Sequence, residues 1–530
     1  MNPKVSVKVP KLSGFDKSFQ NLFTMPVGTI VPCLVDEVIP NTRIHLKSAF
    51  NASLPPLASD TFMRCNLKVE AFFVPTRILY GGFESWLTGD KCYDAMDGEF
   101  VNVGIPMLVY DPADSSYFQS GKLADFLGVR SFSVSGNVPP QLNIFPFLAY
   151  HRIYDDWYRN VLVQTPLYNR DISANGSTGV PVLPFICLGS NGQTYRLDAS
   201  FPDGVSLGSL RQRNFGADYF TTALPNAQLG NAKSIAFHVD ANGDGSISVA
   251  SIRAASSLQQ FAERNQLAGV RLQDFVRANY GADLSSGVAQ RAILLGSGEI
   301  PVYSKGIYQN ANFDTSSMSV DYNNPFVDSV GAEFGSAVCT GQIELIKDFT
   351  AQEPGYVFVM CSLVPKVTYS SGISAMMRRY NSVNSQTDLA TPILCNVGNE
   401  PIYVSELNGN LSNVSLYNPF GYQDRYGSFK SRYDELHGLV RDGQSLASFA
   451  LQRQITGTPT IGTDFLQIPT DYLDQVSATS TAISQYGCWV DCYHSYKVAM
   501  PLPQFSIPSL QDPAYEHGVD VTVQVGGSRL

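Results

Sequence analysis

The sequence predicts a mainly β protein in which one β-core spans all 530 residues and carries long insertions. Segments with strand character stand far apart, near both ends of the chain and in its middle. Loops of tens of residues, rich in Gly, Asn, Ser and Pro, separate them, and helical patterns are few. Because no internal repeat is present, we expect residues 1–530 to form a single domain with large insertions.

Four segments justify the β assignment. The first alternates strictly between apolar and polar side chains, which is typical of a strand with one buried face. The next two are rich in β-branched and aromatic side chains, and the last alternates again. In chain order these segments are 65–74, 356–364, 488–498 and 519–525.

Helices are the minority, and we expect each to lie within an insertion. In 143–160 (NIFPFLAYHRIYDDWYRN) apolar side chains recur at helical spacing, and Pro146 suits a first helical turn. The range 251–281 holds two further helical patterns, which are separated near Gly269 and ended by Gly281.

The segment 161–217 is predicted to be an exposed insertion loop. Its portion 165–210 is dense in Gly, Ser, Asn and Pro, so it offers few side chains that could be buried. We therefore expect this portion to make few core contacts, and its removal to leave the core folded.

The composition indicates a surface that is easily desolvated. Charged residues make up 15% of the chain, against roughly 25% in ordinary soluble proteins, and aromatic residues make up 12%. This apolar content excludes a disordered chain. The net charge is −10, so the chain as a whole is not expected to attract nucleic acid over long distances. We expect much of the surface to face other protein.

Neither a membrane segment nor a secretory signal is expected. The densest apolar stretch, 356–364, is far shorter than the roughly 20 residues that span a bilayer. The nine cysteines are an odd number and contain no CxxC pair, so we expect reduced, mostly buried thiols. Cys488 and Cys492 would lie about 13 Å apart on one strand, which is too far for a disulfide.

Two short motifs match patterns of catalysis or calcium binding, but their surroundings favour turns. Residues 204–208 (GVSLG) fit the GxSxG nucleophile elbow, which requires a strand before the serine. Here Pro202 and Asp203 indicate a turn instead. Residues 240–245 (DANGDG) fit the first half of a calcium loop, but Ser251 stands where the loop needs glutamate. We predict a hairpin tip at that place.

Two further pairs of residues could carry chemistry. Cys492 and His494 would share a strand face, but two ligands without a second pair make a poor metal site. Asp155 and Asp156 form an adjacent acid pair near aromatic residues, yet helix neighbours do not face each other and cannot act on one bond. The residues predict no catalytic group, no bound metal and no cofactor.

Positive charge is concentrated at the N-terminus. Lys4, Lys8, Lys11 and Lys17 are the candidate nucleic-acid-binding residues, and residues 1–20 would form a basic arm. Composition favours two interpretations equally: a solvated terminus, or a short arm that contacts phosphate.

Six blocks, in order, resemble those of a known family. They are FFVPTRILYGGFESWLTG (72–89), NIFPFLAYHRIYDDWYRN (143–160), DYFTTALPNAQLG (218–230), SIRAASSLQQFAERNQLAG (251–269), FGYQDRYGSFKSRYDELHG (420–438) and MPLPQFSIPSL (500–510). The chain is thereby identified as similar to the major capsid proteins of the microviruses, small tailless single-stranded DNA phages, and especially to their gokushovirus-like branch.

The resemblance implies an eight-stranded antiparallel viral jelly roll, a β-sandwich with long loops, and a structural role rather than an enzymatic one. It implies a T=1 icosahedral shell of sixty copies around circular single-stranded DNA. The implied partners are other copies at fivefold, threefold and twofold contacts, the packaged DNA on the inner face, a small basic DNA-packaging protein, a minor or pilot capsid protein, and a host surface receptor. The implied location is the virion, after synthesis and assembly in the host bacterial cytoplasm.

The alternative from another class is a jelly-roll carbohydrate-binding protein or glycoside hydrolase. A glycosidase requires two carboxylates about 5–9.5 Å apart in a cleft, and Asp155 with Asp156 is the adjacent acid pair near aromatic residues. A β-rich secreted adhesin is a third possibility, which the missing signal and the odd number of cysteines oppose.

Overall fold

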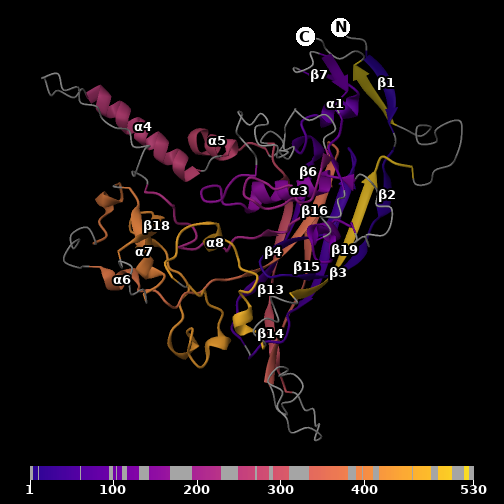
Figure 1. Ribbon diagram of the computed structural model, residues 1–530. Helices are drawn as coiled ribbons and strands as arrows, with labels where there is room; N and C mark the ends of the chain where they lie inside the picture. Colours follow the sequence, from indigo (N-terminus) through magenta and orange to yellow (C-terminus); the bar gives the residue numbers. More distant parts are fainter. Residues whose placement is uncertain are drawn as a thin grey trace, which may run out of the picture.

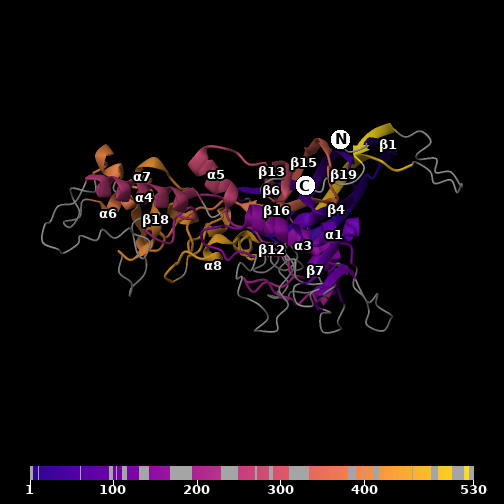
Figure 2. The ribbon, with the colours of Figure 1, turned by 90° about the horizontal axis from the view of Figure 1, so that it is seen from above.

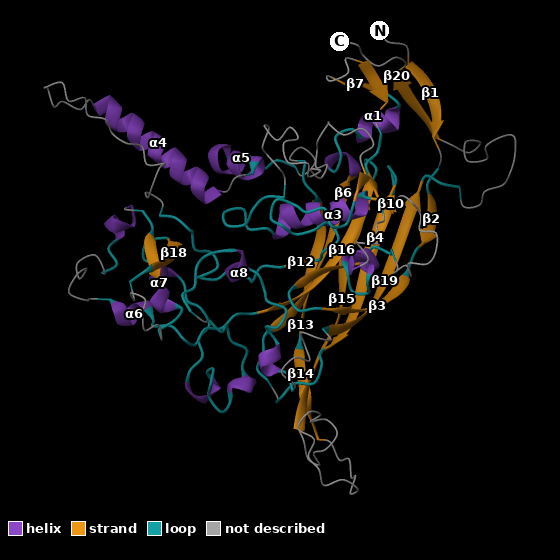
Figure 3. Ribbon diagram, in the orientation of Figure 1, coloured by secondary structure: helices purple, strands orange, loops and turns teal. Residues whose placement is uncertain are grey.

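A computed structural model gives the fold (Figures 1 and 3). All structural statements below concern the residues that it describes. These are 4–9, 11–59, 61–94, 99–102, 104–109, 116–129, 142–167, 194–227, 249–268, 271–285, 290–309, 333–379, 389–396, 398–409, 417–455, 457–478, 487–503 and 519–524.

Two antiparallel sheets pack face to face and form a β-sandwich. The first sheet has five strands in the order β12-β4-β16-β6-β13. Its strands are β12 (Arg211–Gln212), β4 (Thr29–Val38), β16 (Gly355–Pro365), β6 (Cys65–Pro75) and β13 (Ile293–Pro301).

The second sheet has the order β14-β15-β5-β19-β2, and β3 also pairs with β19. Strand β19 therefore lies between β5 and the N-terminal strands, although it comes near the end of the chain. The strands are β14 (Tyr303–Gln309), β15 (Glu333–Thr350), β5 (Arg43–Ser53), β19 (Cys488–Met500), β2 (Ser13–Asp16) and β3 (Phe19–Met25).

The mainly β prediction is confirmed, and three of the four predicted strands lie in this sandwich. Residues 65–74 and 356–364 form β6 and β16, which pair directly, and 488–498 lies in β19 of the facing sheet. The fourth segment behaves differently. It forms β20 (Val519–Gln524), which pairs with β1 (Lys4–Val9) in a separate two-stranded ribbon. This predicted strand is therefore a strand, but it lies outside the two sheets of the sandwich.

The main core lies between the two sheets and follows the alternation of the strands. Val69 and Phe73 of β6 point into it, as do Val357 and Val359 of β16, and Phe50 of β5 reaches it from the facing sheet. Each of these side chains is at most 1% exposed, so this interior is fully withdrawn from water.

The first sheet is also buried on much of its outer face. Phe72 of β6 and Phe358 of β16 point away from the sandwich into a second apolar cluster, together with Tyr150 of helix α3 (Phe145–Ile153). Every residue of β16 is buried. The molecule therefore has three layers here: the second sheet, the first sheet, and a layer of helix and loop.

The segment 194–210 belongs to this third layer. This finding corrects the prediction that 161–217 is an exposed loop. Leu197 and Leu207 are fully buried in the second cluster, and Phe201 is nearly so. Strand β12 then pairs with β4 at the edge of the first sheet. A few apolar side chains in a Gly- and Ser-rich segment are enough to anchor it, so the expectation of few core contacts is wrong for 194–210. Residues 168–193 lie outside the described part of the chain.

Glycines allow the two sheets to approach closely along one side. A Cβ atom on Gly296 of β13 would lie 2.0 Å from the carbonyl oxygen of Leu345 in β15, and one on Gly298 would lie 2.6 Å from Ile343. Across the contact, a Cβ on Gly341 would lie 2.9 Å from Ile300. Only residues without a side chain permit this approach, which closes the sandwich along the side where the chain passes from β13 in the first sheet to β14 in the second.

The helices lie outside the sandwich. The range predicted as helix over 143–160 corresponds to α3 and to a π-helical turn, η3 (Tyr154–Tyr158). Two helices, α4 (Val249–Ala268) and α5 (Leu272–Tyr280), lie to one side, and α4 projects away from the sheets (Figures 1 and 2). Gly281 ends α5 in a left-handed conformation with a φ of 67°, as the sequence predicted.

A loop-rich lobe lies beside the sandwich and below α4 in Figure 1. It contains α6 (Ala375–Arg378), β17 (Glu400–Tyr403), β18 (Pro419–Gln423), α7 (Gly427–Lys430) and α8 (Thr463–Leu466). The remaining short elements are η1 (Thr76–Ile78), α1 (Phe83–Thr88), β7 (Lys91–Asp94), β8 (Glu99–Asn102), β9 (Met107–Leu108), α2 (Leu123–Phe126), β10 (Leu142–Asn143), β11 (Thr194–Tyr195), η4 (Pro392–Asn396), η5 (Val404–Glu406), η6 (Gly438–Val440), η7 (Ala447–Phe449) and η8 (Asp474–Val476).

Within the described ranges, no helix combines the length and the apolar character needed to cross a membrane. The side chains of seven cysteines are described, and all seven are free thiols; six are buried and Cys395 is exposed. Cys488 and Cys492 are among the buried ones, and burial raises the pKa of the Cys488 thiol to about 12. The prediction of reduced, mostly buried thiols is confirmed for these positions.

Candidate functional site

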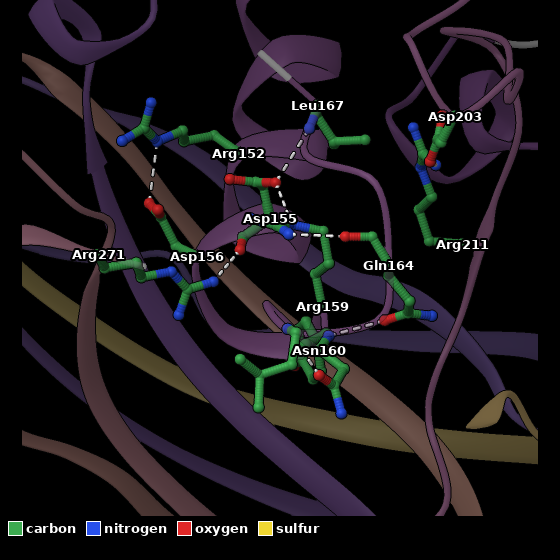
Figure 4. A network of polar contacts seen from close by, with 12 residues as sticks. Arg152, Asp155, Asp156, Arg159, Asn160, Gln164, Leu167, Asp203, Arg211 and Arg271 are labelled. Atoms are coloured by element: carbon green, nitrogen blue, oxygen red, sulfur yellow. Dashed lines mark hydrogen bonds and ion pairs between the residues drawn. The ribbon is translucent and has the colours of Figure 1, made fainter. Parts of the chain in front are cut away.

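The acid pair that the sequence singled out belongs to a buried ion-pair network (Figure 4). Asp155 and Asp156 lie on η3 and are 1% and 2% exposed. The Asp155 carboxylate accepts a hydrogen bond from Arg159 Nε at 2.6 Å, and that of Asp156 accepts one from Arg152 Nε at 2.9 Å. Each carboxylate therefore has a guanidinium partner four residues away, Arg152 on α3 and Arg159 directly after η3.

Two arginines from other segments complete the network. Arg271, just before α5, donates to the backbone carbonyl of Asp155, and Arg291 donates to that of Asp156. The Arg291 guanidinium also lies over the Trp157 ring, 4.6 Å from its centroid. The network ties the helical insertion to the edge of the first sheet and leaves neither carboxylate facing a cleft. The adjacent acid pair of the glycosidase alternative is thus held in structural ion pairs.

A second buried polar group links α3 to the loop that follows β11. Arg211 Nε donates to His151 Nδ1 at 2.9 Å, and His151 Nε2 lies 2.9 Å from the Leu207 carbonyl oxygen. Arg211 also forms an ion pair with Asp203. Burial, reinforced by the charge of Arg211, holds the pKa of His151 well below its ordinary value. A neutral imidazole, protonated on Nε2, satisfies both contacts.

The short motifs form turns or fall outside the described residues. Ser206 of the GxSxG match is nearly buried, its hydroxyl oxygen lies 2.6 Å from that of Ser209, and Gly204 adopts a left-handed turn conformation. The calcium-like motif at 240–245 is not among the described residues. Cys492 and His494 do share a buried strand face, with Sγ and Nε2 3.3 Å apart. No group of three His, Cys, Asp or Glu residues suited to a metal occurs in the described segments.

The four candidate lysines do not lie on one arm. Lys4 and Lys8 belong to β1, where their Cα atoms oppose those of Gln524 and Asp520. Lys11 is exposed. Lys17 is different, because its Nζ atom lies 2.5 Å from the Asp36 carboxylate of β4. Lys17 is thus part of a structural ion pair that holds the segment between β2 and β3 against the sandwich.

The outer face of the second sheet carries exposed aromatic and apolar side chains. On β19, Trp489 and Tyr493 are 46% and 52% exposed, and Leu22 of the neighbouring β3 is 75% exposed. Leu22 opposes Asp491, which lies between the two aromatic residues on β19. We call Leu22, Trp489 and Tyr493 the sheet-face patch. Among the described residues, the outer face of the first sheet differs, because the second apolar cluster covers β16 and its neighbours, and the exposed positions of β13 are Ser297, Glu299 and Pro301.

Two other patches lie on separate elements. Leu258 and Phe261 are exposed on α4, and Met376 and Met377 are exposed on α6. Figure 1 places these helices apart from each other and from β19. Contiguous exposed apolar groups on several surfaces are typical of a protein that binds other chains. The sequence predicted an easily desolvated surface, but it did not locate these patches.

Comparisons with known proteins agree with this architecture. The family model described as Capsid protein (F protein) matches residues 5–240 and 226–510. The chain is 25% identical to the Capsid protein VP1 of Chlamydia phage 1, over 94% of this chain and 96% of that protein. It is 22% identical to that of Bdellovibrio phage phiMH2K, over 94% and 95% of the two chains, and 23% identical to that of Spiroplasma virus 4, over 92% and 93%.

All three relatives come from microviruses of the gokushovirus type, so the resemblance read from the six sequence blocks is confirmed. The matched region covers the sandwich, both buried networks and all three exposed patches. The name of the matched family describes a structural role. This role agrees with the finding that the carboxylates of Asp155 and Asp156 are held in buried ion pairs. The chain belongs to the Capsid protein (F protein) family.

Proposed function

We propose that this chain is the major structural subunit of a T=1 icosahedral shell, in which sixty copies enclose circular single-stranded DNA. The observation that carries the proposal is the placement of exposed apolar side chains on three separate surfaces: the face of β19 and β3, helix α4, and helix α6. A subunit of a closed shell contacts neighbours around several symmetry axes and needs a distinct surface for each. The low charge of the chain reduces the cost of desolvating such surfaces.

The charge of the subunit requires that the DNA be held by local groups. At −10 per chain, sixty copies carry about −600, and the DNA adds one negative charge per nucleotide. The inner face should therefore be neutral or basic. We propose that Lys4, Lys8 and Lys11 contact DNA phosphates there, whereas Lys17 is already paired with Asp36. A small basic DNA-packaging protein would supply further positive charge.

The proposal includes further partners and a location. A minor or pilot capsid protein and a host surface receptor would contact the assembled shell, whose location is the virion. Synthesis and assembly would take place in the host bacterial cytoplasm. The free thiols of the described cysteines fit a reducing compartment.

Negative-stain microscopy and sedimentation of the purified chain test the shell. Leu258→Asp places a charge in the α4 patch and should lower the yield of closed particles at least tenfold without lowering the melting temperature. Ser256→Asp, at an exposed polar position of the same helix, is the matched control and should assemble normally. A chain that stays monomeric under all assembly conditions, or a Leu258→Asp variant that assembles like the control, would contradict the proposal.

A further inference from the structure

A cavity of about 250 Å³ in the loop-rich lobe combines arginine and aromatic side chains. Arg378 and Arg379 come from the end of α6, and Arg425 comes from the turn between β18 and α7. Tyr403 and Phe429 form further parts of the wall. These segments are separated in sequence, so the fold brings three guanidinium groups together around one space.

Each guanidinium lies against an aromatic ring. The distance from the Arg Cζ atom to the ring centroid is 4.6 Å for Arg378 over Tyr403 and 3.5 Å for Arg379 over Phe429. For Arg425 over Tyr426 the distance is 5.4 Å. Stacking fixes the planes of these groups and reduces the entropy that they would lose on binding a ligand.

The charges of the cavity are only partly compensated. Arg378 forms an ion pair with Glu406, and Glu400 accepts a hydrogen bond from the backbone N–H of Gly427 at 2.9 Å. In the described part of the chain, neither Arg379 nor Arg425 has a carboxylate partner: Arg379 donates to the hydroxyl of Ser428, and the buried Nε of Arg425 has no hydrogen-bond acceptor. A buried donor without an acceptor raises the free energy of the folded state. This donor and the uncompensated charge of the two guanidinium groups favour an anionic ligand in the cavity.

The backbone beside Arg425 is also unusual. Tyr426 has a φ of 61°, in the left-handed region that residues other than glycine rarely adopt. Its ring is nearly buried, and the following N–H, that of Gly427, is held by Glu400. Strained residues that the surroundings hold in place cluster at binding sites. With this backbone conformation, Arg425 and the ring of Tyr426 both line the cavity.

We propose that this cavity binds a nucleotide unit, with the phosphate on the Arg379 and Arg425 guanidinium groups and the base against a stacked arginine–aromatic pair. A guanidinium fork matches the geometry of a phosphate, and its plane is a surface on which bases stack. A carboxylate side chain from a second copy would fill only a small part of the volume. Tyr417, which is 53% exposed, lies at the lining and offers a further ring.

The bound nucleotide unit is either part of single-stranded DNA or a free mononucleotide. Binding of single-stranded DNA rests on the proposed function, whereas binding of a free mononucleotide does not. Binding to the full-length, unassembled chain separates the two questions. We would measure a fluorescein-labelled ten-nucleotide DNA by anisotropy, and dAMP, inorganic phosphate and an acidic peptide as competitors. We expect the oligonucleotide to bind and dAMP to compete at least tenfold better than phosphate.

The double variant Arg379→Gln/Arg425→Gln should lower the affinity for the oligonucleotide and for dAMP at least tenfold. Arg64→Gln is the matched control, because Arg64 is an exposed arginine in a different cleft; it should change the affinity less than twofold. Arg379→Lys keeps the charge and loses the fork, so it should bind with intermediate affinity. If the double variant does not fold, ultraviolet crosslinking of a bromodeoxyuridine-labelled oligonucleotide to the wild-type chain tests the same site, with the crosslink expected at Tyr403 or Tyr417.

Three results would overturn the inference: equal competition by phosphate and dAMP, preferential binding of the acidic peptide, or a crosslink that maps away from the cavity. Binding of dAMP but not of the oligonucleotide would assign the site to a free mononucleotide. Particle formation is measured separately. The nucleotide-binding proposal can therefore be wrong although shells form, and the shell proposal can be wrong although the cavity binds a nucleotide.

Discussion

Arg213 and Glu70 form a bidentate ion pair that joins the segment after β12 to strand β6. Arg213 Nη1 lies 2.7 Å from Glu70 Oε2, and Nη2 lies 2.9 Å from Oε1. The Tyr158 hydroxyl donates to the same carboxylate at 2.5 Å. Burial alone would raise the pKa of Glu70, but the hydrogen bonds and charge of Arg213 bring it below its ordinary value.

Removal of one member of this pair should be strongly destabilising. Arg213→Met leaves the Glu70 carboxylate buried without its partner, and we expect a loss of about 3–5 kcal/mol in the free energy of unfolding. Arg277→Gln, in the exposed pair with Asp283, is the control and should cost less than about 1 kcal/mol. Urea unfolding of the unassembled chain measures both, and equal losses would contradict the prediction.

The neutral His151 should make stability depend on pH. Because its pKa is lowered in the folded state, the unfolded chain binds a proton near pH 6.5 that the folded chain does not. Stability should therefore fall as the pH falls, by at most about 2 kcal/mol between pH 7 and pH 5 from this residue alone, the limit set by the unfolded pKa. His151→Gln can keep both hydrogen bonds and should lose this part of the pH dependence. His437→Gln, at an exposed position, is the control for the loss of a histidine, and equal pH dependence in the His151→Gln variant and the wild type would contradict the prediction.

The glycine contact between β13 and β15 should not tolerate a side chain. In Gly296→Ala the new Cβ atom would meet the Leu345 carbonyl oxygen at 2.0 Å, which is a backbone atom of a paired strand and cannot move freely. We expect a loss at the upper end of about 1–3 kcal/mol. Gly216→Ala, where no atom lies within 4 Å, should leave the melting temperature unchanged. A stable Gly296→Ala variant would show that the sheets can separate at this side.

Replacement of the N-terminal lysines should have two different effects, one on DNA retention and one on the stability of the subunit. Replacement of Lys4, Lys8 and Lys11 by Gln should leave particles that form normally but retain less DNA, seen as a lower ratio of absorbance at 260 nm to 280 nm. Lys17→Gln should instead lower the melting temperature of the subunit, because it breaks the ion pair with Asp36. Unchanged DNA retention in the triple variant would rule out a role for these lysines in holding DNA.

Local patterns in the sequence predicted the strands that pack on an alternating face. Residues 65–74 could be assigned because each side chain of β6 meets the same layer as the one two positions away. The same alternation in 519–525 predicted a strand but could not identify its partner, β1. The alternation of Val5, Val7 and Val9 with polar residues was a signal for that partner.

The third layer and the cavity could not be predicted in this way. Leu197 and Leu207 are apolar residues in a largely polar segment, and they pack in a cluster that is built from distant elements, among them α3 and β16. Arg378 and Arg425 are almost fifty residues apart, and no spacing rule joins them. Such sites depend on contacts between segments that have no local pattern in common.

The position of β19 between β5 and the N-terminal strands has a consequence for synthesis on the ribosome. Strand β5 ends at Ser53, and β19 begins only at Cys488. At about 5–20 residues per second, the edge of β5 that β19 will cover waits roughly 20–90 s for its partner. An unpaired strand edge is a template for aggregation. The nascent chain therefore exposes this edge for most of its translation, and a chaperone that shields it should raise the yield of soluble subunit.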